Sequence, residues 1–301
     1  MFGQNIVLNI MIVLGFDVKN LMASFFGALR LDDLGFWGQR TFSAPFIRAI
    51  NYHDVPPFQA KEFERQLLYY KNRFEIVGPT ELESLAAGSQ VSSRPGLILS
   101  FDDGLRSHAE VVAPLLEKHG LMGWFMVPGG FVDEAPEKQR DFARAMTIEY
   151  YDYDYGDARI AMNWSDIRRM AEIHEFGCHT WSHKRLTSKL SDEELEDEIL
   201  KAKRQLEEKL GRNVRTFCWV GGEEFAYSKN ASRVIRNAGF QFSFMSNSQM
   251  IHADTDMMQL QRTNIEARNT EELVRFQLSG LMDIFYWPKR RRINMLTKEY
   301  S

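Results

Sequence analysis

Strand-like and helix-like segments alternate along the chain from about residue 46 onward, and this alternation constrains the fold more than any other feature. Continuous apolar runs such as 96–101 and 121–127 predict strands that are buried on both faces. Amphipathic segments lie between such runs, and 191–210 is the clearest because a capping box opens it and a glycine ends it. Repeated units of this kind predict a parallel sheet covered by helices. About seven such units favour an α/β fold, a distorted (β/α) barrel that is either closed or incomplete.

Composition excludes several classes of protein. The 301 residues include 37 basic and 41 acidic side chains, a formal net charge of −4, and 44% are hydrophobic. A disordered chain is excluded, because this apolar content is enough to offset the entropy lost on folding. A nucleic-acid partner is not expected, because a binder that depends on bulk charge would show a basic excess. Only two cysteines are present, which excludes a disulfide-rich scaffold.

The chain is expected to have three parts: an N-terminal helical extension at 1–45, the barrel at 46–285 and a basic tail at 286–301. The apolar run 6–16 is too short to cross a bilayer, which takes about 20 residues. No basic residue precedes this run, as one would in a signal peptide. We therefore expect a cytoplasmic protein.

Two further segments leave contact with the inner membrane surface open. The stretch 21–30 is amphipathic, which fits either a helix packed on the barrel or a helix lying on a membrane. The basic cluster 289–292 fits either a solvated tail or a contact with anionic lipid. Nothing in the sequence predicts an oligomeric state.

Reactive side chains stand at the ends of predicted strands, where (β/α) barrels place their active sites. Asp102 and Asp103 directly follow the buried strand at 96–101. Adjacent carboxylates cannot stay inside the sheet as unpaired charges, and a divalent metal would relieve their repulsion. One of them can bind the metal while the other stays available as a base. A solvated Asp-Asp-Gly turn is the alternative.

Two histidines stand at the end of a second predicted strand, 176–179. His183 follows His179 by four residues, a spacing that on a helical turn brings both imidazoles within reach of one metal. Two histidines and one aspartate leave positions open for water and substrate, which is typical of a catalytic metal site. Two unrelated surface histidines are the alternative. A third strand, 46–52, ends just before His53.

Together these motifs resemble those of the polysaccharide deacetylase family, the NodB-homology fold of carbohydrate esterase family four. Residues 99–104 (Leu-Ser-Phe-Asp-Asp-Gly) are similar to the first family motif. Residues 179–183 (His-Thr-Trp-Ser-His) are similar to the second. The resemblance covers roughly 46–280 and implies the deacetylase type of (β/α) barrel.

The resemblance also implies roles for individual residues. Asp103, His179 and His183 would bind the metal, Zn²⁺ or another divalent ion such as Co²⁺ or Ni²⁺. Asp102 would be the general base. His53 would be the general acid, because the segment Tyr-His-Asp-Val is similar to that of family members with this histidine near the N-terminus.

The third family motif is altered in this chain. The family's Pro-Tyr-Gly is replaced: Val220, at the end of the predicted strand 216–220, and Gly221 stand where Pro and Tyr would be. The N–H of Gly221 is expected to donate to the oxyanion, and Trp219 is expected to contact substrate. Arg215 and Arg262 are both candidates for the family's site arginine, and neither is ranked as a site residue.

The resemblance implies a metal-dependent hydrolase that removes an N-acyl group, expected to be acetyl, from an amino sugar of a glycan or glycan precursor. Two alternatives are a non-catalytic sugar-binding member and a hydrolase of a non-sugar amide. The aromatic and acidic run 150–155 fits a sugar-binding surface, an oligomer contact or a solvated loop. Cys178 and Cys218 are expected to be buried thiols rather than ligands.

Overall fold

The computed structural model describes residues 46–89 and 94–298, so the helical extension expected at 1–45 lies outside the described residues. The strands of the described part form one parallel sheet. They are β1 (Ile47–Tyr52), β2 (Glu75–Ile76), β3 (Gly96–Phe101), β4 (Trp124–Val127), β5 (Glu175–Cys178), β6 (Thr216–Cys218), β7 (Phe242–Met245) and β8 (Leu260–Asn264).

Seven of these strands close into a barrel. β1 pairs with both β8 and β3, so the order β1-β8-β7-β6-β5-β4-β3 returns to β1. The short β2 pairs with Gly96 and Leu97 at the start of β3, and β4 pairs with Ser100 and Phe101 further along it. The predicted (β/α) barrel is confirmed, and of the two forms left open the closed one is found.

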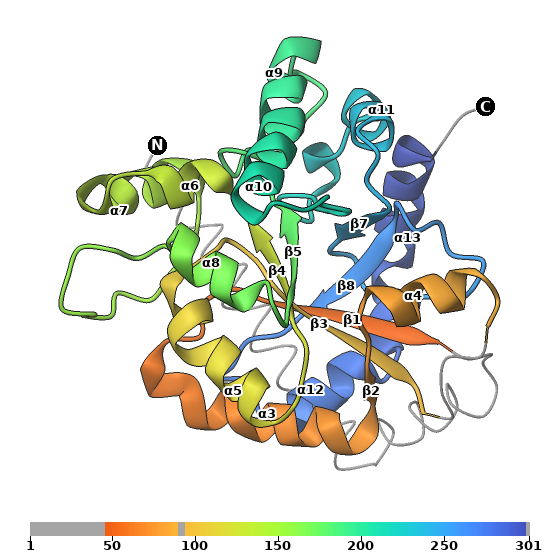
Figure 1. The fold of residues 1–301 in the computed structure, drawn as a ribbon. Coiled ribbons are helices and arrows are strands. Elements are labelled where there is room, and N and C mark those ends of the chain that lie inside the picture. Colours follow the sequence, from red (N-terminus) through yellow and green to blue (C-terminus); the bar gives the residue numbers. More distant parts are fainter. Residues whose placement is uncertain (1–45, 90–93, 299–301) are drawn as a thin grey trace, which may run out of the picture.

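Helices surround the strands on the outside of the barrel (Figure 1). The α-helices are α3 (Ala60–Arg73), α4 (Pro79–Ala86), α5 (Ala113–Lys118), α6 (Gly129–Asp133), α7 (Pro136–Met146), α8 (Trp164–Met170), α9 (Asp192–Glu196), α10 (Ala202–Leu210), α11 (Lys229–Asn237), α12 (Glu271–Leu278) and α13 (Leu281–Thr297). Short helical turns of other types are η1 (Pro57–Gln59), η2 (His108–Val112), η3 (Asp197–Lys201) and η4 (Glu224–Ala226).

The helix predicted at 191–210 is confirmed as the continuous run of α9, η3 and α10. The Ser191 side chain accepts a hydrogen bond from the N–H of Glu194, and the Glu194 side chain accepts one from the N–H of Ser191. Gly211 ends the run with a φ of +65°. This conformation is left-handed, which favours glycine, so the local sequence sets both ends of the helix.

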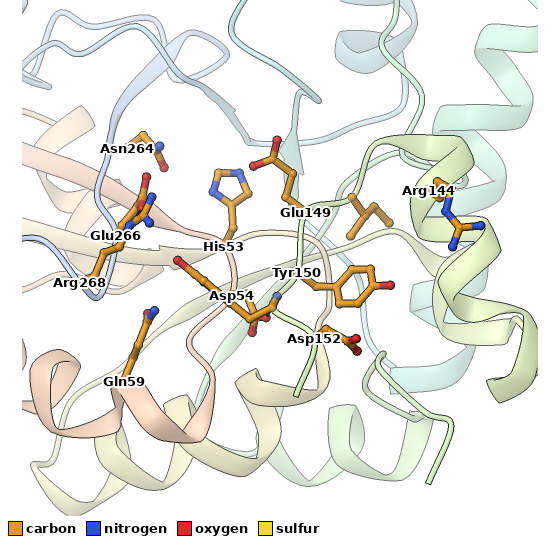
Figure 2. A pocket seen from close by; sticks show the side chains of 12 residues that line it. His53, Asp54, Gln59, Arg144, Glu149, Tyr150, Asp152, Asn264, Glu266 and Arg268 are labelled. Atoms are coloured by element: carbon orange, nitrogen blue, oxygen red, sulfur yellow. Dashed lines mark hydrogen bonds and ion pairs between the residues drawn. The ribbon is translucent and has the colours of Figure 1, made fainter. Parts of the chain in front are cut away.

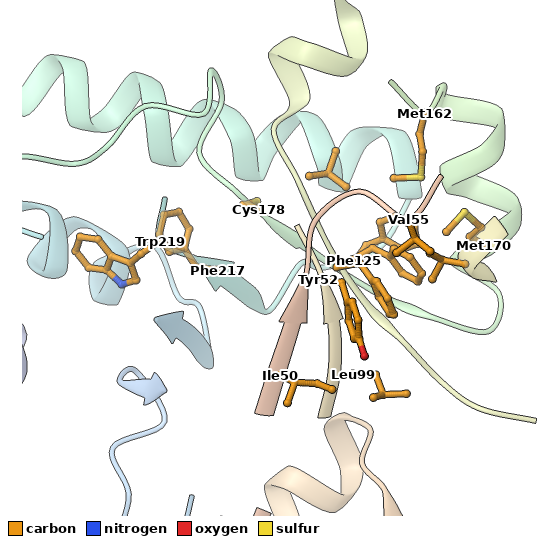
Figure 3. Close-up of a cluster of buried hydrophobic side chains, with 14 of the residues drawn as sticks. Ile50, Tyr52, Val55, Leu99, Phe125, Met162, Met170, Cys178, Phe217 and Trp219 are labelled. Atoms are coloured by element: carbon orange, nitrogen blue, oxygen red, sulfur yellow. The ribbon is translucent and has the colours of Figure 1, made fainter. Parts of the chain in front are cut away.

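The strand residues that face the helices form the main hydrophobic cluster, part of which is drawn in Figure 3. The alternate residues face the inside of the barrel. On β1 these are Ile47, Ala49 and Asn51, and on β3 they are Ile98 and Ser100. The interior therefore changes from apolar to polar toward the carboxyl ends of the strands, where the candidate site residues stand.

The boundary expected at residue 286 is absent, because α13 continues from Leu281 to Thr297. Arg290, expected in a basic tail, is buried, and its Nη1 donates to the carbonyls of Asn247 and Ser248. Within the described ranges, no helix combines the length and the apolar character needed to span a bilayer.

Candidate metal centre and active site

Three of the predicted site residues meet at the carboxyl ends of β3 and β5. Oδ1 of Asp103 lies 3.0 Å from Nε2 of His183 and 3.4 Å from Nε2 of His179. All three side chains are buried. Burial raises the pKa of Asp103, but the two imidazoles outweigh it and hold this pKa well below its ordinary value.

The hydrogen bonds on the far side of each ring fix what the cluster can bind. Nδ1 of His179 lies 3.0 Å from the carbonyl of Cys218, and Nδ1 of His183 lies 2.8 Å from the carbonyl of Met146. A carbonyl can only accept, so in the neutral rings Nδ1 carries the proton and Nε2 presents a lone pair. Second partners of this kind are typical of histidines that bind metals.

The donor set fits a divalent metal. Oδ1 of Asp103 is buried and receives no well-formed hydrogen bond from the described residues. When both rings are neutral, it converges with the Nε2 lone pairs of His179 and His183. Two nitrogens and one carboxylate oxygen are ligands that Zn²⁺ and neighbouring transition metals accept.

A second group of side chains, Asp102, His179 and Cys218, also lies close enough to share an ion. Two observations argue against it. Burial raises the pKa of the Cys218 thiol well above its ordinary value, which disfavours the thiolate that a metal would bind. Both carboxylate oxygens of Asp102 accept hydrogen bonds from Arg262.

Backbone strain is concentrated at the cluster. Asp103 has a φ of +79°, Thr180 of +55° and His183 of +61°, a region that non-glycine residues rarely adopt. Such conformations cost free energy and persist only where the surrounding structure enforces them. Two of the three metal-ligand candidates thus have a strained backbone.

The segment that carries His179 and His183 is a turn and not the helical turn expected from their spacing. The strained φ values at Thr180 and His183 bring the two rings together instead. Glu198 of η3 holds this turn: it accepts hydrogen bonds from the N–H of Trp181 (3.1 Å), the N–H of Ser182 (2.9 Å) and the hydroxyl of Ser182 (2.5 Å).

Glu198 was not predicted as a site residue, although its position in the sequence indicates a buried carboxylate. Glu198 is buried and stands between Leu195 and Ala202 on the inward face of a helix that was predicted correctly. An acidic side chain inside an apolar stripe needs a partner. The turn supplies that partner.

Of the two arginines that the sequence left unranked, Arg262 on β8 contacts the site. Its Nη1 and Nη2 donate to Oδ1 and Oδ2 of Asp102 at 2.7 and 2.8 Å. Nη1 also donates to the hydroxyl of Ser100 at 3.0 Å. Burial raises the pKa of Asp102, but Arg262 and then His179 outweigh it and lower this pKa. Arg215, the other candidate, pairs with Glu83 outside the site.

A pocket of about 710 Å³ adjoins this site (Figure 2). His53 lines it, next to Asn264 of β8. Burial raises the pKa of Asp102 and that of Asp103. The nearby His53 is among the groups that lower both values. The predicted acid therefore lines the pocket and lies near the two carboxylates.

One wall of the pocket is the segment 148–152, which overlaps the aromatic and acidic run singled out in the sequence. Asp54 anchors this wall, since its Oδ2 accepts the N–H of Tyr151 at 2.7 Å. Its Oδ1 accepts the hydroxyl of Ser107 at 2.6 Å. Tyr151 in turn packs edge-on against Phe58, with 5.6 Å between ring centroids.

The structure does not support a substrate contact by Trp219. Its side chain is buried in the cluster outside the strands and donates to the hydroxyl of Ser243 at 2.9 Å. The backbone N–H of Trp219 donates to the carbonyl of Phe244. Gly221 lies in the next loop with a φ of +82°, and its carbonyl accepts the hydroxyl of Tyr227. Its role as an oxyanion donor stays a prediction.

Comparisons with known proteins agree with the motifs and the barrel. The family model "Polysaccharide deacetylase" matches residues 90–243. A search of curated proteins finds no significant match.

Solved structures show the same fold. The deacetylase PplD of Streptococcus pyogenes, in complex with acetate, is 18% identical, with 78% of this chain and 99% of that chain covered and a TM-score of 0.61. IcaB from Ammonifex degensii is 19% identical, with 80% and 98% covered and a TM-score of 0.61. A de-N-acetylase from Aggregatibacter actinomycetemcomitans is 15% identical, with 77% and 100% covered and a TM-score of 0.60. Because the family model matches about half of the chain, the protein belongs to the polysaccharide deacetylase family.

Proposed function

We propose that this protein is a metal-dependent N-deacetylase that acts on an N-acetylated amino sugar of a glycan or glycan precursor. One observation carries the proposal. Oδ1 of Asp103 and Nε2 of both His179 and His183 converge within 3.4 Å, next to a second buried carboxylate, Asp102. Family membership supports carbohydrate deacetylation as the reaction class.

Asp103, His179 and His183 would hold the metal, Zn²⁺ or another divalent ion such as Co²⁺ or Ni²⁺. A metal bound there supplies Lewis acidity, which polarises the amide carbonyl and eases deprotonation of water. The carbonyls of Cys218 and Met146 keep both rings in the orientation that this binding needs.

Asp102 is the proposed general base. The two hydrogen bonds from Arg262 keep its carboxylate ionised and fix its orientation beside Asp103. One of its oxygens takes a proton from the attacking water. Asn51 supports this carboxylate, since its Nδ2 lies 3.3 Å from Oδ2.

His53 is the proposed general acid. Its ring lines the pocket, and its backbone carbonyl is 2.8 Å from Nε2 of the buried His108, which fixes the backbone at the end of β1. A protonated imidazole can give its proton to the leaving nitrogen of the amino sugar. The Gly221 N–H is the proposed donor to the oxyanion.

The pocket is the proposed glycan site. Its volume of about 710 Å³ is of the order expected for small-molecule sites. Tyr150 and Tyr151 offer aromatic faces for sugar rings, and Arg268, Glu266 and Asn264 offer hydrogen bonds to hydroxyls.

The proposal is tested by acetate release from N-acetylated amino-sugar oligomers after loading with Zn²⁺. Asp102→Asn and His53→Ala are each expected to lower kcat by about 100-fold or more, the usual contribution of a general base or acid. Asp254→Asn and His252→Ala are matched controls, because neither residue lines the pocket or belongs to the metal centre. Full activity of Asp102→Asn would contradict the proposed mechanism.

A further inference from the structure

Helix α13 presents an unusual outward face. A helix on the surface of a globular protein normally carries polar side chains on the side away from the core. Of the eight large hydrophobic residues exposed in the described part of the chain, four lie on α13. They are Ile284 (74% exposed), Phe285 (73%), Trp287 (53%) and Met295 (51%).

These residues share one side of the helix with basic residues. Ile293 and Met282 are buried against the barrel. Each exposed residue on the opposite side of the helix lies three or four positions from another of them. They are Ile284, Trp287, Pro288, Arg291, Met295 and, just past the helix, Lys298. Phe285 and Arg292 lie at one edge of this face. Figure 1 shows that α13 lies at the periphery of the barrel.

The charge of α13 is opposite in sign to that of the whole protein. Residues 281–298 contain five basic side chains and one acidic one, Asp283, in a chain whose net charge is −4. Asp283 pairs with Arg48 of β1, so it does not neutralise the helix. Lys289 donates to the carbonyl of Gly222, and Arg290 to carbonyls of the loop after β7. Arg292 pairs with Glu224, so the basic groups of the outward face are chiefly Arg291 and Lys298. Asp254 and Asp256 line the same hollow as these two residues, and Asp256 pairs with Arg236.

We propose that this face of α13 binds the surface of an anionic phospholipid membrane. Aromatic and aliphatic side chains on a convex helix, mixed with arginine and lysine, suit the boundary between headgroups and acyl chains. The basic residues match the negative potential of anionic lipids. A second copy of this chain suits the face less well, because a symmetric contact would bring two positive surfaces together.

Binding here would place the catalytic edge of the barrel next to the membrane. Lys289 contacts Gly222, and Arg292 pairs with Glu224 at 2.9 Å, both in the loop that follows β6. This loop leaves the same edge of the barrel as Asp102 and His179. The membrane proposal does not rest on the proposed chemistry, because the outward residues of α13 lie outside the pocket and the metal centre.

The test is flotation of the full chain with vesicles of phosphatidylcholine alone or with added phosphatidylglycerol. We expect the protein to float only with the anionic vesicles. Two double variants, Phe285→Ser/Trp287→Ser and Arg291→Glu/Lys298→Glu, are each expected to lower partitioning by about tenfold or more. Ile173→Ser/Leu68→Ser and Arg204→Glu are matched controls, because these residues are exposed elsewhere on the barrel.

Sedimentation velocity without lipid and deacetylase activity on a soluble substrate complete the experiment. A monomer with unchanged activity in both double variants is the expected result, and it separates lost docking from lost folding. The proposal is overturned if the wild type does not float with anionic vesicles, or if both variants float like the wild type. A dimer that the α13 variants dissociate also overturns it, because the face would then be a subunit contact.

Discussion

The candidate metal centre and the pocket beside it are built in different ways. The three metal-ligand candidates are buried and lie on two short segments, each directly after a strand. The pocket wall at 148–152 is partly exposed and belongs to a segment without strands, which a hydrogen bond to Asp54 anchors. The proposed chemistry thus depends on buried groups that directly follow strands, while the surface proposed to contact the glycan lies on a loop segment.

The largest loss of stability is expected from breaking the buried ion pair between Arg262 and Asp102. Arg262→Met leaves Asp102 as an unpaired buried charge, which is expected to cost about 3–5 kcal/mol of unfolding free energy. Arg215→Met is the matched control, because its pair with Glu83 is partly exposed and is expected to contribute at most about 1 kcal/mol. Urea unfolding of both variants measures the difference. Equal losses would mean that Asp102 does not depend on Arg262.

A smaller loss of stability is expected from a change at Glu198, which holds the turn that carries His179 and His183. Glu198→Gln removes the charge and one of the acceptors for Trp181 and Ser182. We expect about 1–3 kcal/mol lower stability and metal affinity reduced by about 10–100-fold. Glu208→Gln, on the exposed side of α10, is the control. Unchanged metal affinity in Glu198→Gln would show that the turn keeps its shape without this carboxylate.

The smallest effect is expected at the pocket wall. Tyr151→Ala removes an aromatic ring from the pocket but keeps the N–H that Asp54 holds. We expect KM for a glycan oligomer to rise about fivefold, roughly 1 kcal/mol, with kcat and metal content unchanged. Tyr153→Ala is the control, because this ring also contacts Phe58 but does not line the pocket. A fall in kcat without a change in KM would mean that the wall supports the chemistry.

The same contrast explains what the sequence could predict. The barrel and the set of candidate ligands follow from local patterns: a buried strand, then the side chains that must leave the sheet. The convergence of Asp103, His179 and His183 could therefore be predicted. Trp219 was assigned wrongly, although the two-residue period of β6 places it with Phe217 on the outer side and Cys218 on the inner side.

Contacts between distant parts of the chain could not be predicted. Arg262 and Asp102 are 160 residues apart, and only closure of the barrel brings them together. The shape of the turn at 179–183 depends on Glu198, which lies on another element. The spacing of the two histidines correctly predicted that they lie close together. The helical turn expected to bring them together was wrong.

Metal content measured by mass spectrometry is the decisive test of the proposed metal centre. The purified protein, dialysed against Zn²⁺ and then against buffer, is compared with the double variant His179→Ala/His183→Ala and with His252→Ala. We expect about one metal per chain in the wild type and in His252→Ala, and none in the double variant. Absence of bound metal from the wild type, or equal metal in all three proteins, would contradict it.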